Sequence, residues 1–169
     1  MKKVSLLLIV ITTIASAQLR LGLDVSRELS LAGIEAEKAE GMGFTLGYEQ
    51  MLLSLVGVGA EYSLAGDEGI DMLYGYAVGK IPVGFPMARG IIRAGYSLPM
   101  GDASDFYEAG LAYGVGLRVK PPLFPVGIEA LYTIHNLEMK SDGDDFAEMF
   151  ASLLELKYNV LTVTATYSF

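Results

Sequence analysis

The sequence predicts an all-β fold, an eight-stranded antiparallel up-and-down transmembrane β-barrel. Three observations predict it. The chain of 169 residues is 52% hydrophobic, yet beyond its N-terminal region it lacks the apolar run of about 18 residues that a membrane-spanning helix needs. Its apolar residues instead alternate with small or polar ones, and alternate residues of a strand lie on opposite faces of a sheet. Eight segments alternate in this way, and an even number of strands closes into a barrel with both chain ends on one side.

The first seventeen residues, MKKVSLLLIVITTIASA, have the order of a secretory signal peptide. Lys2 and Lys3 precede an apolar stretch, and Ala15-Ser16-Ala17 forms an A-x-A cleavage site. We expect a Sec-type signal in residues 1–17, cleaved before Gln18, and a barrel domain in residues 18–169. An uncleaved membrane anchor is the alternative, but the apolar stretch is short for a membrane span.

The composition excludes several kinds of site. The chain has no cysteine, so it has no disulfide, no thiolate metal site and no cysteine nucleophile. Without Lys2 and Lys3, ten basic residues remain against 20 acidic ones. This acidic excess argues against nucleic-acid binding, which depends on neutralising phosphates. His135 is the only histidine, which excludes a His-rich metal site. We expect no metal and no cofactor.

The first four strands are predicted at residues 18–27, 42–50, 54–64 and 70–80. In each strand, one alternating set is bulky and apolar, and the other is small, polar or charged. The bulky sets are Leu19, Leu21, Leu23 and Val25; Met42, Phe44, Leu46 and Tyr48; Val56, Val58, Ala60, Tyr62 and Leu64; and Met72, Tyr74, Tyr76 and Val78. The opposite sets are rich in glycine, including Gly22, Gly43, Gly47, Gly57, Gly59, Gly75 and Gly79.

The last four strands are predicted at residues 89–98, 105–119, 125–138 and 154–169 from the same pattern. Their bulky sets are Ile92, Ala94, Tyr96 and Leu98; Tyr107 and Ala109 with Leu111 to Val119; Val126, Ile128, Ala130, Tyr132 and Ile134; and Leu161, Val163, Ala165, Tyr167 and Phe169. The segment YEAGLAYGVGLRV shows the pattern most clearly, because its second face is glycine and alanine between Glu108 and Arg118.

Residues 144–158 leave helix, loop and strand open. Phe146, Met149, Phe150, Leu153 and Leu154 recur at helical spacing. Leu156, Tyr158 and Val160 alternate instead, but out of phase with Leu161 to Phe169. A β-bulge near Val160 and Leu161 would bring both sets to one face. An extra strand pair, which would make ten strands, is the alternative.

The connections alternate between two types. The longer ones are often charged, as in ELSLAGIEAEKAEG and KSDGDDFAEMFAS, whereas PVGFPMA and PPLF are compact and uncharged. This alternation predicts loops at one end of the barrel, and turns with both chain termini at the other.

The glycine-rich face is predicted to line the interior. At eight strands the interior is just wide enough for side chains to fill it, so bulky residues on both faces would overpack it. A soluble ligand-binding barrel with the bulky face inside is the alternative, but a water-facing surface of Gly, Ala and Thr would carry too few charges for solubility. Aromatic residues near the strand ends are typical of membrane interfaces. These are Tyr48, Tyr62, Tyr74, Tyr96, Tyr107, Tyr167 and Phe169.

The inward face is predicted to carry a lumen charge network. Its members are Arg20, Asp24, Glu49, Glu61, Arg93, Glu108, Arg118 and Glu129. Buried charges are tolerated where they are paired, so we expect a polar plug that fills the lumen. The alternative is a small porin-like diffusion channel, weakly cation-selective because the predicted network has an acidic excess.

We expect no catalytic residues. Ser141 and Glu138 lie near His135 in the sequence, but Ser141 is placed in a loop and no nucleophile lies two residues from His135 on the same strand face. The acidic residues Asp142, Asp144, Asp145 and Glu148 match no calcium-binding loop, so we interpret them as a solvated loop.

The C-terminal segment VLTVTATYSF alternates cleanly and ends on Phe169. With the signal peptide and the pair YGVGLRV and VGIEALYTI, it resembles the small OmpA- and OmpX-type outer-membrane barrel domains of Gram-negative-type envelopes. The resemblance covers residues 18–169. It implies a location in the cell outer membrane, contact with outer-membrane lipid, and recognition of the strand ending in Phe169 by the barrel-assembly machinery. We therefore expect a monomeric, non-enzymatic envelope protein with a structural or surface-interaction role.

Overall fold

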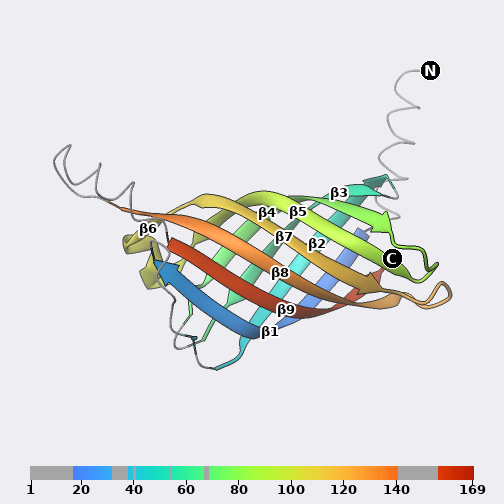
Figure 1. Cartoon of the computed structure of the whole chain (residues 1–169), viewed down its shortest axis with the longest axis horizontal. Helices are drawn as coiled ribbons and strands as arrows, with labels where there is room; N and C mark the ends of the chain where they lie inside the picture. The colour runs from blue at the N-terminus through green and yellow to red at the C-terminus, as the bar shows by residue number, and fades with distance from the viewer. Residues whose placement is uncertain (1–16, 32–37, 40, 54, 67–68, 141–155) are drawn as a thin grey trace, which may run out of the picture.

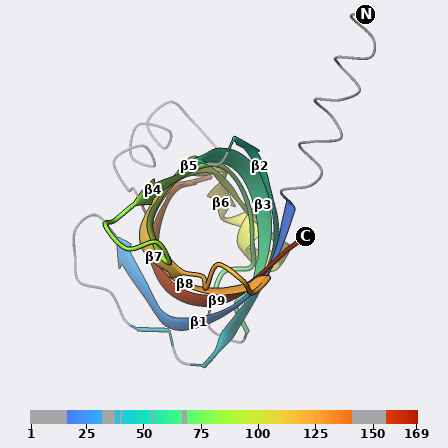
Figure 2. The same ribbon diagram turned by 90° about the vertical axis from the view of Figure 1, so that its right-hand side faces the viewer.

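A computed structural model of the chain shows a closed β-barrel. Figure 1 shows the barrel from the side, and Figure 2 shows it nearly down its axis. The structure describes residues 17–31, 38–39, 41–53, 55–66, 69–140 and 156–169. The predicted signal peptide covers residues 1–17, and all of it except Ala17 lies outside the described residues. None of the helices in the described ranges is long and apolar enough to cross a membrane.

The barrel has eight antiparallel strands in up-and-down order, as the sequence predicts. They are β1 (Ala17–Leu31), β2 (Gly43–Leu53), β3 (Val56–Leu64), β4 (Met72–Pro82), β5 (Ala88–Pro99), β6 (Tyr107–Glu108) with β7 (Gly110–Val119), β8 (Val126–Met139) and β9 (Leu156–Ser168). Each strand pairs with its sequence neighbour, and β1 pairs with β9 to close the ring. The two-residue piece β6 and the strand β7 both pair with β8 and together make one barrel strand.

The two ends of the barrel differ as expected. The turns after β2, β4 and β7 lie at one end, which we call the turn end, and there the Phe169 amide donates to the Ala17 carbonyl oxygen at 3.1 Å. Gly84 in the β4–β5 turn has φ of 88°, a left-handed conformation that glycine adopts without steric cost. The opposite end, which we call the loop end, carries the longer connections and the short helix η1 (Gly101–Asp105).

The bulky sets face outward on every strand except β4 and the two-residue piece β6. On β4, Met72, Tyr74, Tyr76 and Val78 are buried inside the barrel, whereas Gly75 and Ala77 are exposed on the outside. The predicted facing of β4 is therefore wrong. Both of its alternating sets are free of charge between Met72 and Gly79, and here the lumen has room for the larger set.

Two register shifts at the loop end also change the facing. β1 has an extra residue against β9 between Asp24 and Ser26, and such a bulge moves the following side chains to the opposite face. The predicted bulge near Val160 and Leu161 is wrong, because the pairing of β9 with β8 is continuous from Tyr167 to Leu156. Leu156, Tyr158 and Val160 therefore point into the barrel. Residues 141–155, which include most of the stretch left open by the sequence, lie outside the described range.

The second shift separates β6 from β7. Glu108 pairs with Glu138, but Ala112 pairs with His135, so one extra residue lies on the β6–β7 side. The shift turns Tyr107 toward the interior and leaves Glu108 exposed.

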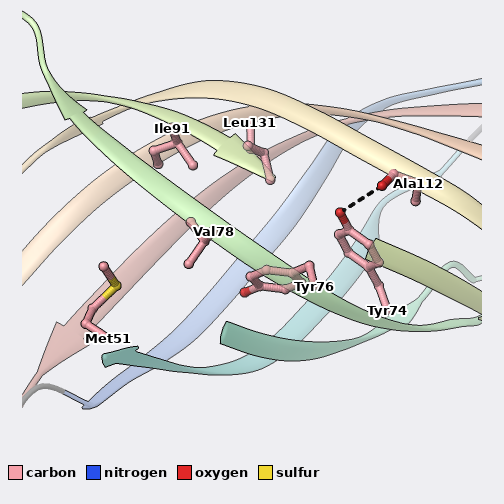
Figure 3. Close-up of a cluster of buried hydrophobic side chains, with 7 residues drawn as sticks. All are labelled: Met51, Tyr74, Tyr76, Val78, Ile91, Ala112 and Leu131. Atoms are coloured by element: carbon pink, nitrogen blue, oxygen red, sulfur yellow. Dashed lines mark hydrogen bonds between the residues drawn. The ribbon is translucent and has the colours of Figure 1, made fainter. Parts of the chain in front are cut away.

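Two groups of apolar side chains fill parts of the lumen. The first, the β4-side cluster, consists of Met51, Tyr74, Tyr76, Val78, Ile91, Ala112 and Leu131 (Figure 3). Tyr74 donates a hydrogen bond to the Ala112 carbonyl oxygen at 3.4 Å, the dashed line in Figure 3. The second, the loop-end cluster, consists of Ile70, Met72, Leu137, Leu156, Tyr158 and Val160. The β4-side cluster reaches the turn-end half through Met51, Val78 and Ile91, and it shares that half with charged side chains.

Candidate functional site

Buried charged side chains meet in the turn-end half of the lumen, with Glu129 of β8 at their centre. Its carboxylate accepts a hydrogen bond from Arg20 and lies 3.5 Å from Arg93 Nη2, 3.5 Å from Arg118 Nε and 3.7 Å from Lys80 Nζ. Glu129 is therefore in contact with four cations, each from a different strand.

Two further carboxylates complete this charge network. Glu49 of β2 accepts a hydrogen bond from Lys80 and lies 3.4 Å from Arg93 and 3.8 Å from Arg20. Glu61 of β3 lies 3.0 Å from Arg93 and 3.5 Å from Arg20. The Arg93 guanidinium also stacks 4.2 Å from the centre of the Tyr76 ring, a cation–π contact that inward-facing β4 makes available.

Asp24 lies apart from this network. Its carboxylate accepts hydrogen bonds from Thr162 at 2.8 Å and Thr45 at 3.2 Å. These hydroxyls belong to the two strands on either side of β1. The threonines that the sequence places on the inward face thus compensate the burial of this carboxylate, because a buried charge needs hydrogen-bonding partners.

The network differs from its prediction at three residues. Asp24, predicted as a member, faces inward but lies apart from the network. Glu108, predicted as a member, is exposed on β6 because of the register shift that precedes β7. Lys80, which the sequence analysis did not select, is buried in the network on β4. The sequence did contain an indication of this position. Lys80 continues the alternation from Met72 to Val78, and a lysine is a poor fit to an outward apolar face.

These three changes alter the charge balance. Among the described residues, Arg20, Lys80, Arg93 and Arg118 face Glu49, Glu61 and Glu129 in the network. The prediction of an acidic excess, on which the expected cation selectivity depended, is therefore wrong for this part of the lumen.

Arg27 is a second buried cation that the sequence analysis did not select. Beyond the bulge in β1 it points inward and donates a hydrogen bond to the carbonyl oxygen of Ala65, in the β3–β4 connection. It therefore ties β1 to a loop-end connection. The bulge that reverses its facing could not be located from the alternation alone.

His135 meets Ser97, whereas Ser141 lies outside the described residues. Ser97 Oγ lies 2.5 Å from His135 Nδ1, and the imidazole packs edge-on against Tyr74 with ring centres 5.4 Å apart. Both polar side chains are buried. A cavity lined in part by His135 has a volume of about 10 Å³, which is room for about one water molecule.

The predicted interface aromatics divide into three groups. Tyr48, Tyr96, Tyr167 and Phe169 are exposed on the outer surface. Tyr62 and Tyr107 are half-buried, and Tyr107 packs against the loop-end cluster. Tyr74 is wrong as an interface residue, because the inward facing of β4 buries it in the lumen.

In the part of the chain that the structure describes, no group of three or more His, Cys, Asp or Glu side chains could hold a metal ion. The acidic residues Asp142, Asp144, Asp145 and Glu148 lie outside that part.

No protein-family model matches the chain, and no curated protein sequence matches it. Its fold is similar to solved structures at low identity. Neisserial surface protein A (NspA) is 11% identical, with a TM-score of 0.63 over 90% of this chain and 97% of that chain. Ail, the attachment invasion locus protein of Yersinia pestis, is 19% identical, with a TM-score of 0.54 over 92% and 99%. The de novo designed TMB2.3 is 13% identical, with a TM-score of 0.55 over 91% and 94%. At these identities the similarity is one of fold.

Proposed function

We propose that this chain is an integral outer-membrane β-barrel protein, exported to the cell envelope and resident in the membrane as a monomer with a closed lumen. Its role is structural, or is surface interaction through the loop end. The observation that carries this proposal is the outer face, where all eight barrel strands expose large apolar side chains, while the charge network lies inside.

This apolar outer face does not fit a soluble protein. Monomeric soluble proteins rarely expose apolar patches beyond a few hundred Å², and here exposed side chains such as Leu21, Ile92, Val115 and Ile128 come from strands all around the barrel. An outward apolar band around a polar interior is the pattern of transmembrane barrels. Closure also leaves no unpaired strand edge, which lipid would not tolerate.

The side chains inside the barrel support a non-conducting protein. The charge network crosses the turn-end half, and the loop-end cluster adds apolar side chains from β4, β8 and β9 on the far side of it. Ion-paired and apolar side chains of this kind give an ion few sites to occupy on its way through.

Two features support the interactions in the proposal. β9 ends in the exposed aromatic pair Tyr167 and Phe169, with ring centres 6.3 Å apart, which suits recognition by the barrel-assembly machinery. The names of Neisserial surface protein A and of the attachment invasion locus protein refer to surface and attachment roles. Those names support a surface role for this fold without identifying a partner.

Fractionation and gel migration test the membrane location. We expect the expressed protein in the outer-membrane fraction, and we expect its migration to differ between heated and unheated samples because a closed barrel resists detergent unfolding. Recovery in the aqueous periplasmic fraction would contradict the proposal and support the soluble barrel.

Planar-bilayer recording tests the closed lumen separately. The purified protein should insert without steady current. Stable open-channel current would contradict the closed lumen and support the small diffusion channel, while leaving the membrane location intact.

A further inference from the structure

A cavity of about 280 Å³ opens at the turn end of the barrel. It lies between the β4–β5 and β7–β8 turns and is lined by Gln18, Arg89, Arg118 and Lys120, together with prolines and a methionine from the two turns. The Lys120 amide donates to the Met87 carbonyl oxygen at 2.8 Å, so the two turns are fixed to each other. The cavity therefore has fixed walls.

The cavity is strongly basic. Arg89, Arg118 and Lys120 line it, and none of its lining residues is acidic. Glu129 approaches Arg118 at 3.5 Å but also contacts three other cations. Partial burial, with Arg118 and Arg89 nearby, lowers the pKa of Lys120. The cavity therefore combines cations that repel one another, in a chain whose formal net charge is −8.

One of these cations is held in position from within the barrel. Arg118 donates to Gln18 Oε1 at 2.8 Å, to Thr166 at 3.2 Å and to Ser168 at 3.3 Å. Gln18 Oε1 also accepts a hydrogen bond from Lys80 at 3.0 Å, which connects the cavity floor to the charge network. A guanidinium fixed in this way is preorganised for an anion, because little side-chain freedom is lost on binding.

We propose that this turn-end cavity binds a phosphate group. Guanidinium groups and a lysine ammonium recognise phosphate by charge-assisted hydrogen bonds. The volume is near the lower end of small-molecule sites, which are roughly 300–1,000 Å³, so a headgroup-sized phosphate ester fits better than a large cofactor.

The surroundings suggest two sources of that phosphate. The same turns expose Phe85 at 72% and Leu123 at 94% of their surface, and apolar tips beside a basic cavity suit the headgroup and acyl chains of a phospholipid. A soluble phosphate ester would use the cations alone.

The first experiment measures binding of inorganic phosphate and glycerol 3-phosphate to the full chain, folded in an uncharged maltoside detergent, by isothermal titration calorimetry. We expect saturable binding that weakens as salt screens the cations. The Arg89→Gln/Lys120→Gln variant should bind at least tenfold more weakly. The matched Lys38→Gln/Lys140→Gln variant, with the same charge change at the loop end, should bind as the parent does.

Absence of saturable binding to the parent would overturn the proposal, as would equal losses in the two variants. Amide chemical shifts in the parent give a check that does not depend on how the variants fold. Phosphate should shift the amides of Gln18, Met87 and Lys120, and shifts confined to the loop end would contradict the site.

The second experiment distinguishes the sources with a short-chain phosphatidylglycerol, used below its micelle concentration. Affinity at least tenfold above that of glycerol 3-phosphate would support the site with a phospholipid as the source. Equal affinity that is lost in Arg89→Gln/Lys120→Gln would support it with a soluble ester. Affinity unaffected by that variant would overturn it.

Discussion

Glycine acts in opposite ways on the two faces of this barrel, as Gly75 and Gly95 on neighbouring strands illustrate. A Cβ added to Gly95 would meet the Gly75 carbonyl oxygen and lie 2.6 Å from Tyr76 Cα, whereas a Cβ on Gly75 would have nothing within 4 Å. Gly95 is therefore required by close backbone approach inside the barrel, and Gly75 lies on the open outer face.

This contrast gives a matched pair of variants. We expect Gly95→Ala to destabilise the barrel by about 1–3 kcal/mol through overpacking. Gly75→Ala should be neutral or stabilise it by up to about 1 kcal/mol, since alanine loses less backbone freedom on folding. Urea unfolding followed by gel migration measures both. Equal destabilisation by the two variants would mean that Gly75 faces inward, as the alternation alone predicts.

The charge network depends most on Glu129, which contacts all four of the network's cations. Glu129→Gln should lower the free energy of unfolding by about 3–5 kcal/mol, because removing one partner leaves buried charge uncompensated. The same measurement on Glu138→Gln, an exposed carboxylate on the same strand, should change stability by no more than about 0.5 kcal/mol. Similar effects at both positions would argue that the network contributes little.

At the scale of the strand, β7 tests the facing most clearly. Val115 lies near the middle of β7, and 59% of its surface is exposed on the outer face. Val115→Arg should cost about 2–4 kcal/mol in a lipid bilayer, the value typical of a cation facing lipid near mid-depth. The effect should shrink when Leu117, nearer the turn end, is changed to Arg. An arginine at Val115 without effect in bilayers would contradict the outward lipid contact.

The sequence predicted strands best where their two faces differ in chemistry. On β2, and on β9 from Leu161 to Tyr167, apolar residues oppose glycine, threonine or glutamate, and the predicted facing is confirmed. On β4, the larger set includes tyrosines that suit either an interface or a roomy lumen, so size alone predicted the wrong face. Lys80 was missed as a member of the network because the facing of β4 was predicted wrongly.

Register shifts limited the prediction at the loop end. A single extra residue in β1 and another between β6 and β7 reverse the facing beyond them, which turns Arg27 inward and leaves Glu108 outside. A bulge leaves no mark in the residue types of the strand that contains it. The alternation therefore shows that the pattern changes phase, but it does not show which strand carries the extra residue. Here β1 carries it, and β9, on which the mismatch is visible, remains regular.

At the scale of the whole molecule, the fold class follows from the number of strands and from which set of side chains fits inside a barrel of that size. The eight-stranded up-and-down barrel is confirmed. The membership of the charge network was predicted in part, because Arg20, Glu49, Glu61, Arg93, Arg118 and Glu129 do meet. The balance of its charges was not predicted, because the alternation misassigned the facing of Glu108 and Lys80, and because Asp24 bonds to threonines instead of joining the network.

The facing of the barrel as a whole is tested most directly by site-directed spin labelling. The chain has no cysteine, so single-cysteine variants at Leu21, Val58, Ile92, Val115, Ile128 and Val163 place one label on the outer face of six strands. In proteoliposomes we expect all six labels to be accessible to oxygen dissolved in lipid and shielded from a water-soluble nickel complex. A label at the exposed loop-end residue Lys38 should show the reverse. If the six outer labels met the nickel complex as readily as the label at Lys38, the apolar face would lie in water and the membrane assignment would be contradicted.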